Sequence, residues 1–385
     1  MRAPAGWVRG TLGDVIELQR GYDLPAPTRT AGPFNVIGSG GPNGTHHKPS
    51  TSGPGVVIGR SGAGYGRAWW SEDDFWALNT GLFVANFRHN NPKYVYYLLD
   101  FLDFTKFNSG GAQPSLNRNY IYPIPVDLPP RPEQRKIADI LCAWDDAIDC
   151  TEALVTRLRG EHRLLLQGLI ARHAHGGHVA LGELVEPVKT KNTVGETNVL
   201  TSSARDGLVS QTEYFNKSVA GKNLSAYYLL HRGDFAYNRS SSAGHPFGAI
   251  RRLDRYDRGV ISILYLCFRL RSDAAMSGTF LQNIFNSGVL DRQLSPICHE
   301  GARSHGLLNI AQSDFFELIV PLPSRDAQAI ANKAIAASSR EVELLQRKAE
   351  ILRTQKRGLM QKLLTGQLRV DVAADIEPRG QSNND

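Results

Sequence analysis

The sequence predicts a mixed α/β (α+β) protein in which two globular domains alternate with two long helices. The first observation is an internal repeat, because positions 126–170 recur at 320–364 with a constant offset of 194 residues. The second is a heptad pattern of apolar residues along each copy, which is typical of paired helices. The third is the segment before the first copy, where Gly and Pro separate short apolar runs typical of strands. A period of 194 residues is too long for a solenoid and indicates the order domain, helix, domain, helix.

The two copies share identical residues near their starts and near their ends. The starts share a Leu-Pro pair followed by an Arg and a Gln, at Leu128, Pro129, Arg131 and Gln134 and again at Leu322, Pro323, Arg325 and Gln328. The ends share six residues, Leu158, Arg159, Arg163, Leu165, Gln167 and Leu169, which recur as Leu352, Arg353, Arg357, Leu359, Gln361 and Leu363. We therefore expect two pseudo-repeated globular domains separated by two long antiparallel coiled-coil helices.

The repeat also suggests where each part begins and ends. We expect a first domain at residues 1–127, a central helix at 128–175, a second domain at 176–322, a distal helix at 323–368 and a tail at 369–385. The tail is polar and acidic, so we expect it to be disordered.

Short apolar runs predict the elements of the first domain. We expect strands at 34–37, 55–58, 81–87 and 120–126. A helix is expected after Asn91, because Pro92 suits the first helical position and aromatic and aliphatic residues follow at helical spacing.

Each long helix begins at a proline-rich segment and spans about 40 residues, or about 60 Å at 1.5 Å per residue. Pro132 and Glu133 suit the first turn, where the missing N–H costs nothing and the carboxylate meets the positive end of the helix dipole. Neither apolar stripe would be stable alone in water, so we expect the two helices to pair with each other. His162 and Lys356 are polar at equivalent positions of the stripe. They either reach out to solvent or fix the register of the pair.

The composition favours a nucleic-acid partner and gives no sign of a membrane segment. The net charge of +7 and the pI near 9.2 suit a polyanion, although a mildly basic protein without such a partner has the same charge. The apolar runs are far shorter than the roughly 20 residues that span a bilayer, and the start lacks an apolar signal segment. The four cysteines form no CxxC pair. We expect a cytoplasmic protein with reduced cysteines and no metal site.

Motifs of common enzyme classes are missing from the sequence. No P-loop, HExxH or G-x-S-x-G motif is present. The run from Asn91 to Tyr94 resembles the Asn-Pro-Pro-aromatic motif of adenine methyltransferases but lacks the second proline. The G-x-G-x-G run at 62–66 does not continue as a dinucleotide-binding loop. We therefore expect that the chain is not an enzyme and binds no cofactor itself.

Polar and basic residues among glycines in two sets of loops favour DNA binding. Arg can bind guanine with two hydrogen bonds, Asn or Gln can do the same with adenine, and Ser can contact either. The loops of the first domain offer Arg60, Ser61, Tyr65, Arg67, Gln113, Asn117, Arg118 and Asn119. Those of the second offer Arg239, Ser240, Ser241, Ser242, His245, Arg303, Ser304, His305 and Asn309, and residues 251–258 add an Arg-rich stretch. Each of these residues alone could equally be a solvated loop residue.

These loops also repeat, although more faintly than the helices. The strand that runs into Arg60 and Ser61 parallels the one that runs into Arg239 and Ser240. Likewise, the dipeptide at 116–117 parallels 308–309, and the Leu-Gly pair at 12–13 parallels 181–182. Two domains of one fold with different loops are expected to bind different versions of one ligand.

The chain resembles the specificity subunits of type I restriction–modification systems over essentially its whole length. The likeness is carried by residues 12–14 (LGD), 36–41 (VIGSGG), 110–117 (GGAQPSLN), 128–138 (LPPRPEQRKIA) and 355–366 (QKRGLMQKLLTG). The second copy departs from the pattern, because Pro130, Pro132 and Glu133 become Ser324, Asp326 and Ala327.

The resemblance implies two target-recognition domains that each read one half of a split sequence in double-stranded DNA. The paired helices would set the gap between the halves. It further implies two copies of a modification subunit with S-adenosylmethionine-dependent adenine methyltransferase activity, and often a restriction motor–nuclease subunit that uses ATP and Mg²⁺. Three alternatives stay open: a protein–protein scaffold that ignores DNA sequence, the specificity subunit of a related methylation-based defence system without a restriction subunit, and a stand-alone methyltransferase or nuclease.

Overall fold

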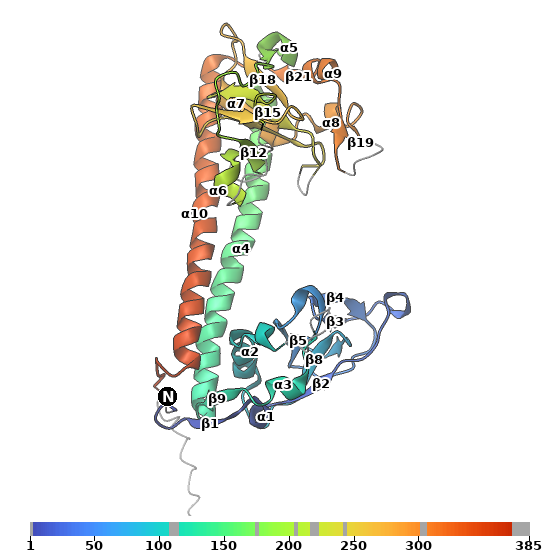
Figure 1. Ribbon diagram of the computed structural model, residues 1–385, viewed down its shortest axis with the longest axis vertical. Coiled ribbons are helices and arrows are strands. Elements are labelled where there is room, and N and C mark those ends of the chain that lie inside the picture. Colours follow the sequence, from blue (N-terminus) through green and yellow to red (C-terminus); the bar gives the residue numbers. More distant parts are fainter. Residues whose placement is uncertain are drawn as a thin grey trace, which may run out of the picture. The chain divides into compact units, whose positions relative to one another are not determined.

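The chain contains two long helices, α4 (Arg131–His173) and α10 (Arg325–Leu364) (Figure 1). The computed structural model describes residues 3–107, 115–173, 177–203, 207–215, 223–241, 245–300 and 306–371. The chain divides into a first unit, Met1–Glu152 with Arg347–Asp385, and a second unit, Ala153–Gln346. Each unit therefore contains one globular domain and part of both helices.

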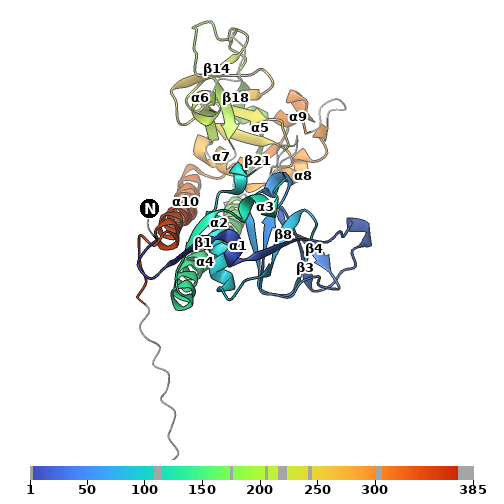
Figure 2. The same cartoon turned by 60° about the horizontal axis from the view of Figure 1, so that its bottom comes forward.

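The first domain consists of β-sheets and short helices. Its elements are β1 (Val8–Thr11), α1 (Leu12–Val15), β2 (Glu17–Arg20), η1 (Ala26–Thr28), β3 (Phe34–Gly38), β4 (Gly41–His46), β5 (Gly55–Gly59), η2 (Gly62–Gly64), β6 (Ala68–Ser71), β7 (Phe75–Ala77), β8 (Gly81–Asn86), α2 (Pro92–Phe101), η3 (Phe104–Lys106), α3 (Arg118–Ile121) and β9 (Pro125–Leu128). An antiparallel sheet has the order β2-β8-β5-β6, a smaller mixed sheet has the order β4-β3-β7 with β3 parallel to β7, and β1 pairs antiparallel with β9. Figure 2 shows α1, α2 and β1 beside α4, with β3 and β4 farther from that helix.

The second domain repeats this plan with different additions. Its elements are β10 (His178–Ala180), α5 (Leu181–Leu184), β11 (Val185–Pro187), β12 (Leu200–Ser203), β13 (Gly207–Ser210), α6 (Gln211–Phe215), β14 (Tyr228–His231), β15 (Phe235–Asn238), β16 (Ala249–Arg252), β17 (Arg258–Ile261), β18 (Leu266–Leu270), α7 (Gly278–Ser287), α8 (Asp291–Leu294), β19 (His299–Glu300), β20 (Leu308–Asn309), α9 (Gln312–Phe316) and β21 (Ile319–Pro321). The sheet β11-β18-β15-β16 has the order of β2-β8-β5-β6, and β10 pairs with β21 as β1 does with β9. The predicted two-domain α/β plan is confirmed.

Each domain has an equivalent glycine that packs closely against an aromatic residue. A Cβ atom on Gly13 would lie 3.2 Å from the Cβ of Tyr122, and one on Gly182 would lie 3.2 Å from the Cβ of Phe316. Contacts that close force the neighbour to move, so glycine permits the approach of α1 and α5 to these residues. The repeated Leu-Gly pair of the sequence thus marks an equivalent packing point in each domain.

A repeated glutamine connects each domain to the start of a long helix. The Gln134 side chain accepts a hydrogen bond from the backbone N–H of Asn91 (2.9 Å) and donates one to the carbonyl of the proline five residues earlier (3.0 Å). Gln328 accepts from the N–H of Ser277 (2.7 Å) and donates to the corresponding proline carbonyl (2.9 Å). Asn91 and Ser277 are the N-caps of α2 and α7. Both glutamines are buried, so each fixes a domain helix against the first turn of a long helix.

The long helices pair antiparallel within each unit, as predicted. In the first unit Lys356 of α10 forms an ion pair with Asp145 of α4, and Arg353 pairs with Glu152. In the second unit the His162 ring lies 3.0 Å from the Ser338 hydroxyl. The Lys356 side chain is only 13% exposed. Both polar residues of the apolar stripes therefore bond across the helix pair instead of reaching out to solvent.

The helices share one apolar core with the domain in each unit. In the first unit Ile137 and Leu141 of α4 and Leu363 of α10 join the core of the domain. In the second unit Ile170 and Ile335 do the same. Burying each such side chain stabilises the fold by about 1.5–3 kcal/mol relative to an exposed one. In the described part of the chain, no helix combines the length and apolar character needed to cross a membrane.

Three side chains join the beginning of the chain, the start of α4 and the segment after α10; we call this set the terminal latch. The carboxylate of Glu133 accepts hydrogen bonds from the guanidinium of Arg369 (2.8 and 2.9 Å) and from the indole N–H of Trp7 (3.1 Å). Arg369 also donates to the carbonyl of Ala5 (2.6 Å). Burial alone would raise the pKa of Glu133, but the bonds from Arg369 and Trp7 outweigh it and lower this pKa.

The predicted elements of the first domain are confirmed except for one. The expected strands at 34–37, 55–58 and 81–87 correspond to β3, β5 and β8, and the helix after Asn91 is α2. The expected strand at 120–126 is wrong, because α3 occupies its beginning and β9 starts only at Pro125. The Asn117 side chain caps α3 by accepting from the N–H of Asn119, which favours a helical turn there. The expected boundary between the central helix and the second domain, at residues 175 and 176, and residues 372–385 of the expected tail lie outside the described residues.

Candidate nucleic-acid interface

Two segments that the sequence singled out separately meet in the first domain. The Arg60-Ser61 pair follows strand β5, and the backbone N–H of Leu116 donates to the carbonyl of Arg60 (2.8 Å). Ser61 forms an isolated β-bridge with Ser115. These bonds place Arg60 beside Asn117 and Arg118, at the end of the central sheet.

The second domain brings its corresponding segments together in the same way. The N–H of Leu308 donates to the carbonyl of Arg239 (2.7 Å), and Ser240 forms a β-bridge with Leu307. Ser241 donates from its backbone to Gly306 (2.7 Å). Asn309 then follows within β20. The faint loop repeat therefore corresponds to one repeated contact between loops. Gln113, Ser242, Arg303, Ser304 and His305 lie outside the described residues.

A basic cavity of about 500 Å³ opens at the meeting point in the first domain. The residues that line it are Gln19, Arg20, Arg60, Leu82, Ser115, Leu116, Asn117 and Arg118. Among these described residues are three arginines and no carboxylate. Arg118 is held in place because its guanidinium donates to the carbonyl of Leu18 (2.7 Å). Such a site suits phosphate oxygens or the acceptor edge of guanine.

Gln19 and Arg20 of this cavity were not predicted from the sequence. They lie at the end of β2, far from the other lining residues along the chain. The faint signal was an exposed polar strand end just before Gly21. Only the pairing of β2 with β8 brings this end to the site.

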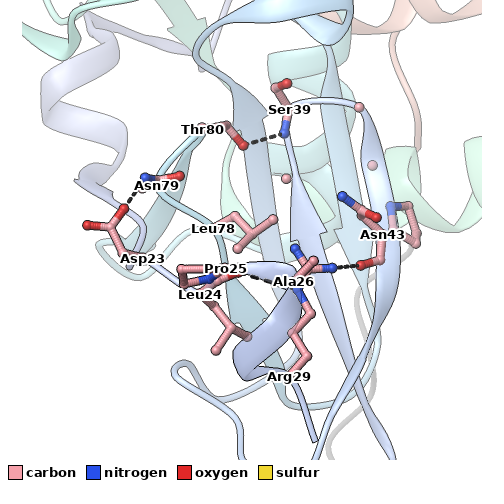
Figure 3. A pocket seen from close by; sticks show the side chains of 14 residues that line it. Asp23, Leu24, Pro25, Ala26, Arg29, Ser39, Asn43, Leu78, Asn79 and Thr80 are labelled. Carbon is pink, nitrogen blue, oxygen red and sulfur yellow. Dashed lines mark hydrogen bonds between the residues drawn. The ribbon is translucent and has the colours of Figure 1, made fainter. Parts of the chain in front are cut away.

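A second cavity, of about 570 Å³, lies in the same domain (Figure 3). Its wall includes a turn at residues 78–80, in which Thr80 accepts from the N–H of Ser39 (3.2 Å) and Asn79 donates to the carboxylate of Asp23. The carbonyls of this turn accept hydrogen bonds from two residues of the basic cavity. The N–H of Arg60 donates to the carbonyl of Thr80 (2.8 Å), and Arg20 donates to that of Asn79 (3.4 Å). The turn thus lines the second cavity and is bonded to two arginines that line the first.

The glycines around these cavities serve close loop packing. A Cβ atom on Gly64 would lie 1.7 Å from the carbonyl oxygen of Ser39, and one on Gly59 would lie 1.9 Å from that of Gly64. No larger residue fits at either place. Gly64, in the middle of the G-x-G-x-G run, is therefore required by the close approach of two loops.

Several predicted residues make contacts inside their own domain. The hydroxyl of Tyr65 donates to the carbonyl of Phe107 (3.0 Å), and burial raises its pKa, so this ring is mainly structural. Arg67 is exposed. The guanidinium of Arg239 donates twice to the carbonyl of Leu264 (2.8 and 3.2 Å).

His245 lies against Arg251, with 3.3 Å between its Nε2 and the guanidinium. Burial, and then the charge of Arg251, lower the pKa of His245 below the ordinary value of 6.5. The ring is therefore neutral at neutral pH. It can offer a hydrogen bond to a base but no charge to a phosphate.

The Arg-rich stretch 251–258 is largely matched by carboxylates of its own domain. The ion pairs are Arg252–Asp254 (2.7 Å), Arg255–Glu213 (3.0 Å) and Arg258–Glu196 (2.6 Å). Because these charges are already paired, they contribute less to attracting a polyanion than the sequence suggested. The basic cavity of the first domain is the stronger candidate.

Comparison with known proteins points in the same direction. Residues 4–159 match the family described as the type I restriction modification DNA specificity domain. The fold is similar to that of a type I restriction–modification S subunit from M. genitalium, with a TM-score of 0.54, 14% identity, and 95% of this chain and 97% of that chain covered. A second solved chain comes from work on complex assembly and conformational transition of the type I R-M system. It matches with a TM-score of 0.57 and 15% identity over 96% of this chain and all of that one.

Proposed function

We propose that this chain, which belongs to the specificity subunits of type I restriction–modification systems, reads a DNA target in two halves, one with each domain. We assign residues 1–127 and 176–322 to the two reading domains. The observation that carries the proposal is the repeated loop contact, Arg60 with Leu116 and Arg239 with Leu308. A duplicated scaffold with different loop side chains is suited to two related but different ligands.

The chemistry of the loops supports direct contact with bases. Arg20, Arg60 and Arg118 meet at one cavity, and arginine is the side chain that most often pairs with guanine. Asn117 lies in the same cavity and can serve adenine. Contacts to phosphates would set the register of the domain, while contacts to base edges would give sequence preference.

We propose that the long helices set the length of the gap between the two half-sites. The two helices are 43 and 40 residues long, and each takes part in both units. Half-sites on a duplex must be reached at a fixed rise and rotation, so a spacer of defined length suits the task. Adding or removing helical turns in both helices should change the accepted gap.

The internal repeat also supports a proposal about partners. A chain with two equivalent faces can bind two copies of one protein, and we propose two copies of a modification methyltransferase. In this proposal S-adenosylmethionine belongs to that partner, and ATP and Mg²⁺ belong to a restriction subunit where one exists. The chain itself performs no chemistry and works in the cytoplasm, where the DNA is.

Methylation mapping tests the proposal. Cells that express this chain with its cognate methyltransferase should carry methyl groups within one bipartite sequence. Replacing residues 6–125 with the corresponding domain of another specificity subunit should change one half of that sequence and keep the other half and the gap. A change of both halves would contradict the assignment of one domain to each half.

A binding competition separates this function from that of a scaffold. The complex should prefer its mapped target over random duplex at one stated salt concentration. Binding without sequence preference would be driven mainly by phosphates and would fall steeply with salt. Equal affinity for both duplexes would favour the scaffold.

A further inference from the structure

A turn leads into a central strand of the main sheet in both domains. In the first domain, residues 78–80 connect β7 to β8, and in the second, residues 262–265 connect β17 to β18. Each turn is bonded to the arginine of the repeated Arg-Ser pair. The carbonyl of Thr80 accepts from the backbone of Arg60, and that of Leu264 accepts from the side chain of Arg239. The two turns therefore hold equivalent places beside the candidate interface.

The tips of these two turns differ in chemistry. The first has Asn79 and Thr80, which line the cavity of Figure 3 with polar groups. The second has Ile263 and Leu264, which are 51% and 60% exposed. Single exposed apolar residues are normal on a protein surface. Here, however, two adjacent branched side chains stand beside the predicted contact loop, and Leu307 of that loop is also 37% exposed.

Local hydrogen bonds hold the second turn in a defined conformation. The N–H of Tyr265 donates to the carbonyl of Ser262 (3.1 Å), and that of Leu264 donates to the Ser262 hydroxyl (3.3 Å). The hydroxyl of Tyr265 accepts from the backbone of Ser202 (3.4 Å). Arg239 adds two bonds to the same turn. A braced turn presents its apolar side chains with little loss of conformational freedom when a ligand binds.

We propose that Ile263 and Leu264 contact a thymine methyl group in the half-site read by the second domain and thereby help to determine its sequence. The C5-methyl of thymine is the apolar group that base pairs display in the major groove, and aliphatic side chains recognise it. Arg239 acts as a positioning residue that holds the turn. This inference rests on the proposed function and adds a chemical class of contact to it.

Removing the methyl group from the DNA tests the contact directly. The reconstituted complex of chain and methyltransferase is titrated with duplexes of the mapped target in which single thymines are replaced by uracil. Burying one methyl-sized group is worth about 0.8 kcal/mol, or about fourfold in affinity. We expect a loss of about three- to fivefold at one or more thymines of the second half-site.

The matching protein variant carries Ile263→Asn and Leu264→Ser, which makes the tip of this turn polar and leaves no aliphatic group there to contact the thymine methyl. It should bind the original target more weakly and bind the thymine and uracil forms equally well. Its response to changes in the first half-site should stay that of the wild type, which also shows that it is folded. Ile330→Ser serves as the control, because Ile330 is 64% exposed but lies on α10. It should leave both responses unchanged.

The outcomes separate this inference from the function on which it rests. A wild-type complex insensitive to uracil at every position of the second half-site would overturn the methyl contact. The methyl contact would also be overturned if the second half-site contained no thymine, or if the double variant kept the uracil sensitivity of the wild type. In each case sequence-specific binding by the wild type would still support the proposed function. Loss of all sequence preference in the wild type would overturn both.

Discussion

Removing Arg369 should destabilise the chain more than removing its ion-pair partner Glu133. The two groups of the terminal latch differ in burial, since the Glu133 side chain is 3% exposed and that of Arg369 is 42% exposed. Arg369→Ala leaves a buried carboxylate without its counter-charge. Glu133→Ala instead removes the buried charge and lets the guanidinium return to water.

The magnitudes follow from this difference. Breaking a fully buried pair by removing one partner costs about 3–5 kcal/mol, mainly because the remaining charge is left buried without its partner. Arg369→Ala leaves the 3% exposed carboxylate of Glu133 in that state, so its cost should approach this range from below, since Arg369 itself is 42% exposed. Glu133→Ala should cost about 1–2 kcal/mol, mainly the hydrogen bonds to Arg369 and Trp7. The double variant should resemble Glu133→Ala, because the second change then removes a solvated charge.

The pKa of Glu133 gives these variants a pH signature. The folded-state pKa lies below the ordinary value of 4.5, so in the wild type this contribution to stability is present above about pH 4.5 and is lost as the pH falls further. In Arg369→Ala the counter-charge is gone and burial raises the pKa. The stability difference between the two proteins should therefore be largest at neutral pH and shrink toward pH 4.

Urea denaturation followed by the helical circular dichroism signal measures these differences. Arg9→Ala is the control, because the Arg9 side chain of its ion pair with Asp127 is 48% exposed, and an ion pair this exposed contributes little to stability. The reasoning is refuted if Arg369→Ala is no more destabilising than Glu133→Ala. It is also refuted if the double variant loses the sum of both single effects.

Three further predictions concern the repeat, the helix pair and the interface. Gln134→Ala and Gln328→Ala should each destabilise the chain by about 2 kcal/mol in urea, because each removes a buried glutamine and leaves the partly buried N–H of a helix N-cap without its acceptor. If only one of the two variants is destabilised, the two junctions are not equivalent. Burial lowers the folded-state pKa of His162, so protonation favours the unfolded state and stability should fall as the pH drops below about 6.5; His162→Gln should flatten this decline in urea midpoints measured at pH 7.5 and 5.5. Arg60→Ala should weaken binding or relax base preference by about 1–3 kcal/mol in the first half-site alone, whereas Arg157→Ala on α4 should leave DNA titrations unchanged.

The sequence revealed the parts of the fold whose cause is local or repeated. The heptad stripes predicted α4 and α10, and the repeated Gln134 and Gln328 marked equivalent junctions before their hydrogen bonds were known. Arg60 and Arg239 were found for the same reason, since each follows a strand that has a counterpart in the other domain.

Contacts between segments far apart in the sequence could not be predicted in this way. Arg20 reaches the basic cavity only through strand pairing. The Arg-rich stretch looked like an anion site because its carboxylate partners, such as Glu196 and Glu213, come from distant positions. The aromatic run at Tyr120 suggested a strand, but a side-chain cap at Asn117 favours a helical turn.

The terminal latch lies at the junction between a long helix and the first strand of the domain in the first unit. In the second unit the corresponding junction is made by continuous backbone. There α4 passes into β10 through residues 174–177 of the chain itself, and the residue that corresponds to Glu133 is Ala327. At the other junction α10 and β1 belong to opposite ends of the polypeptide, and Arg369, Glu133 and Trp7 join them. The first unit therefore closes this junction with side chains, where the second unit closes it with its own backbone.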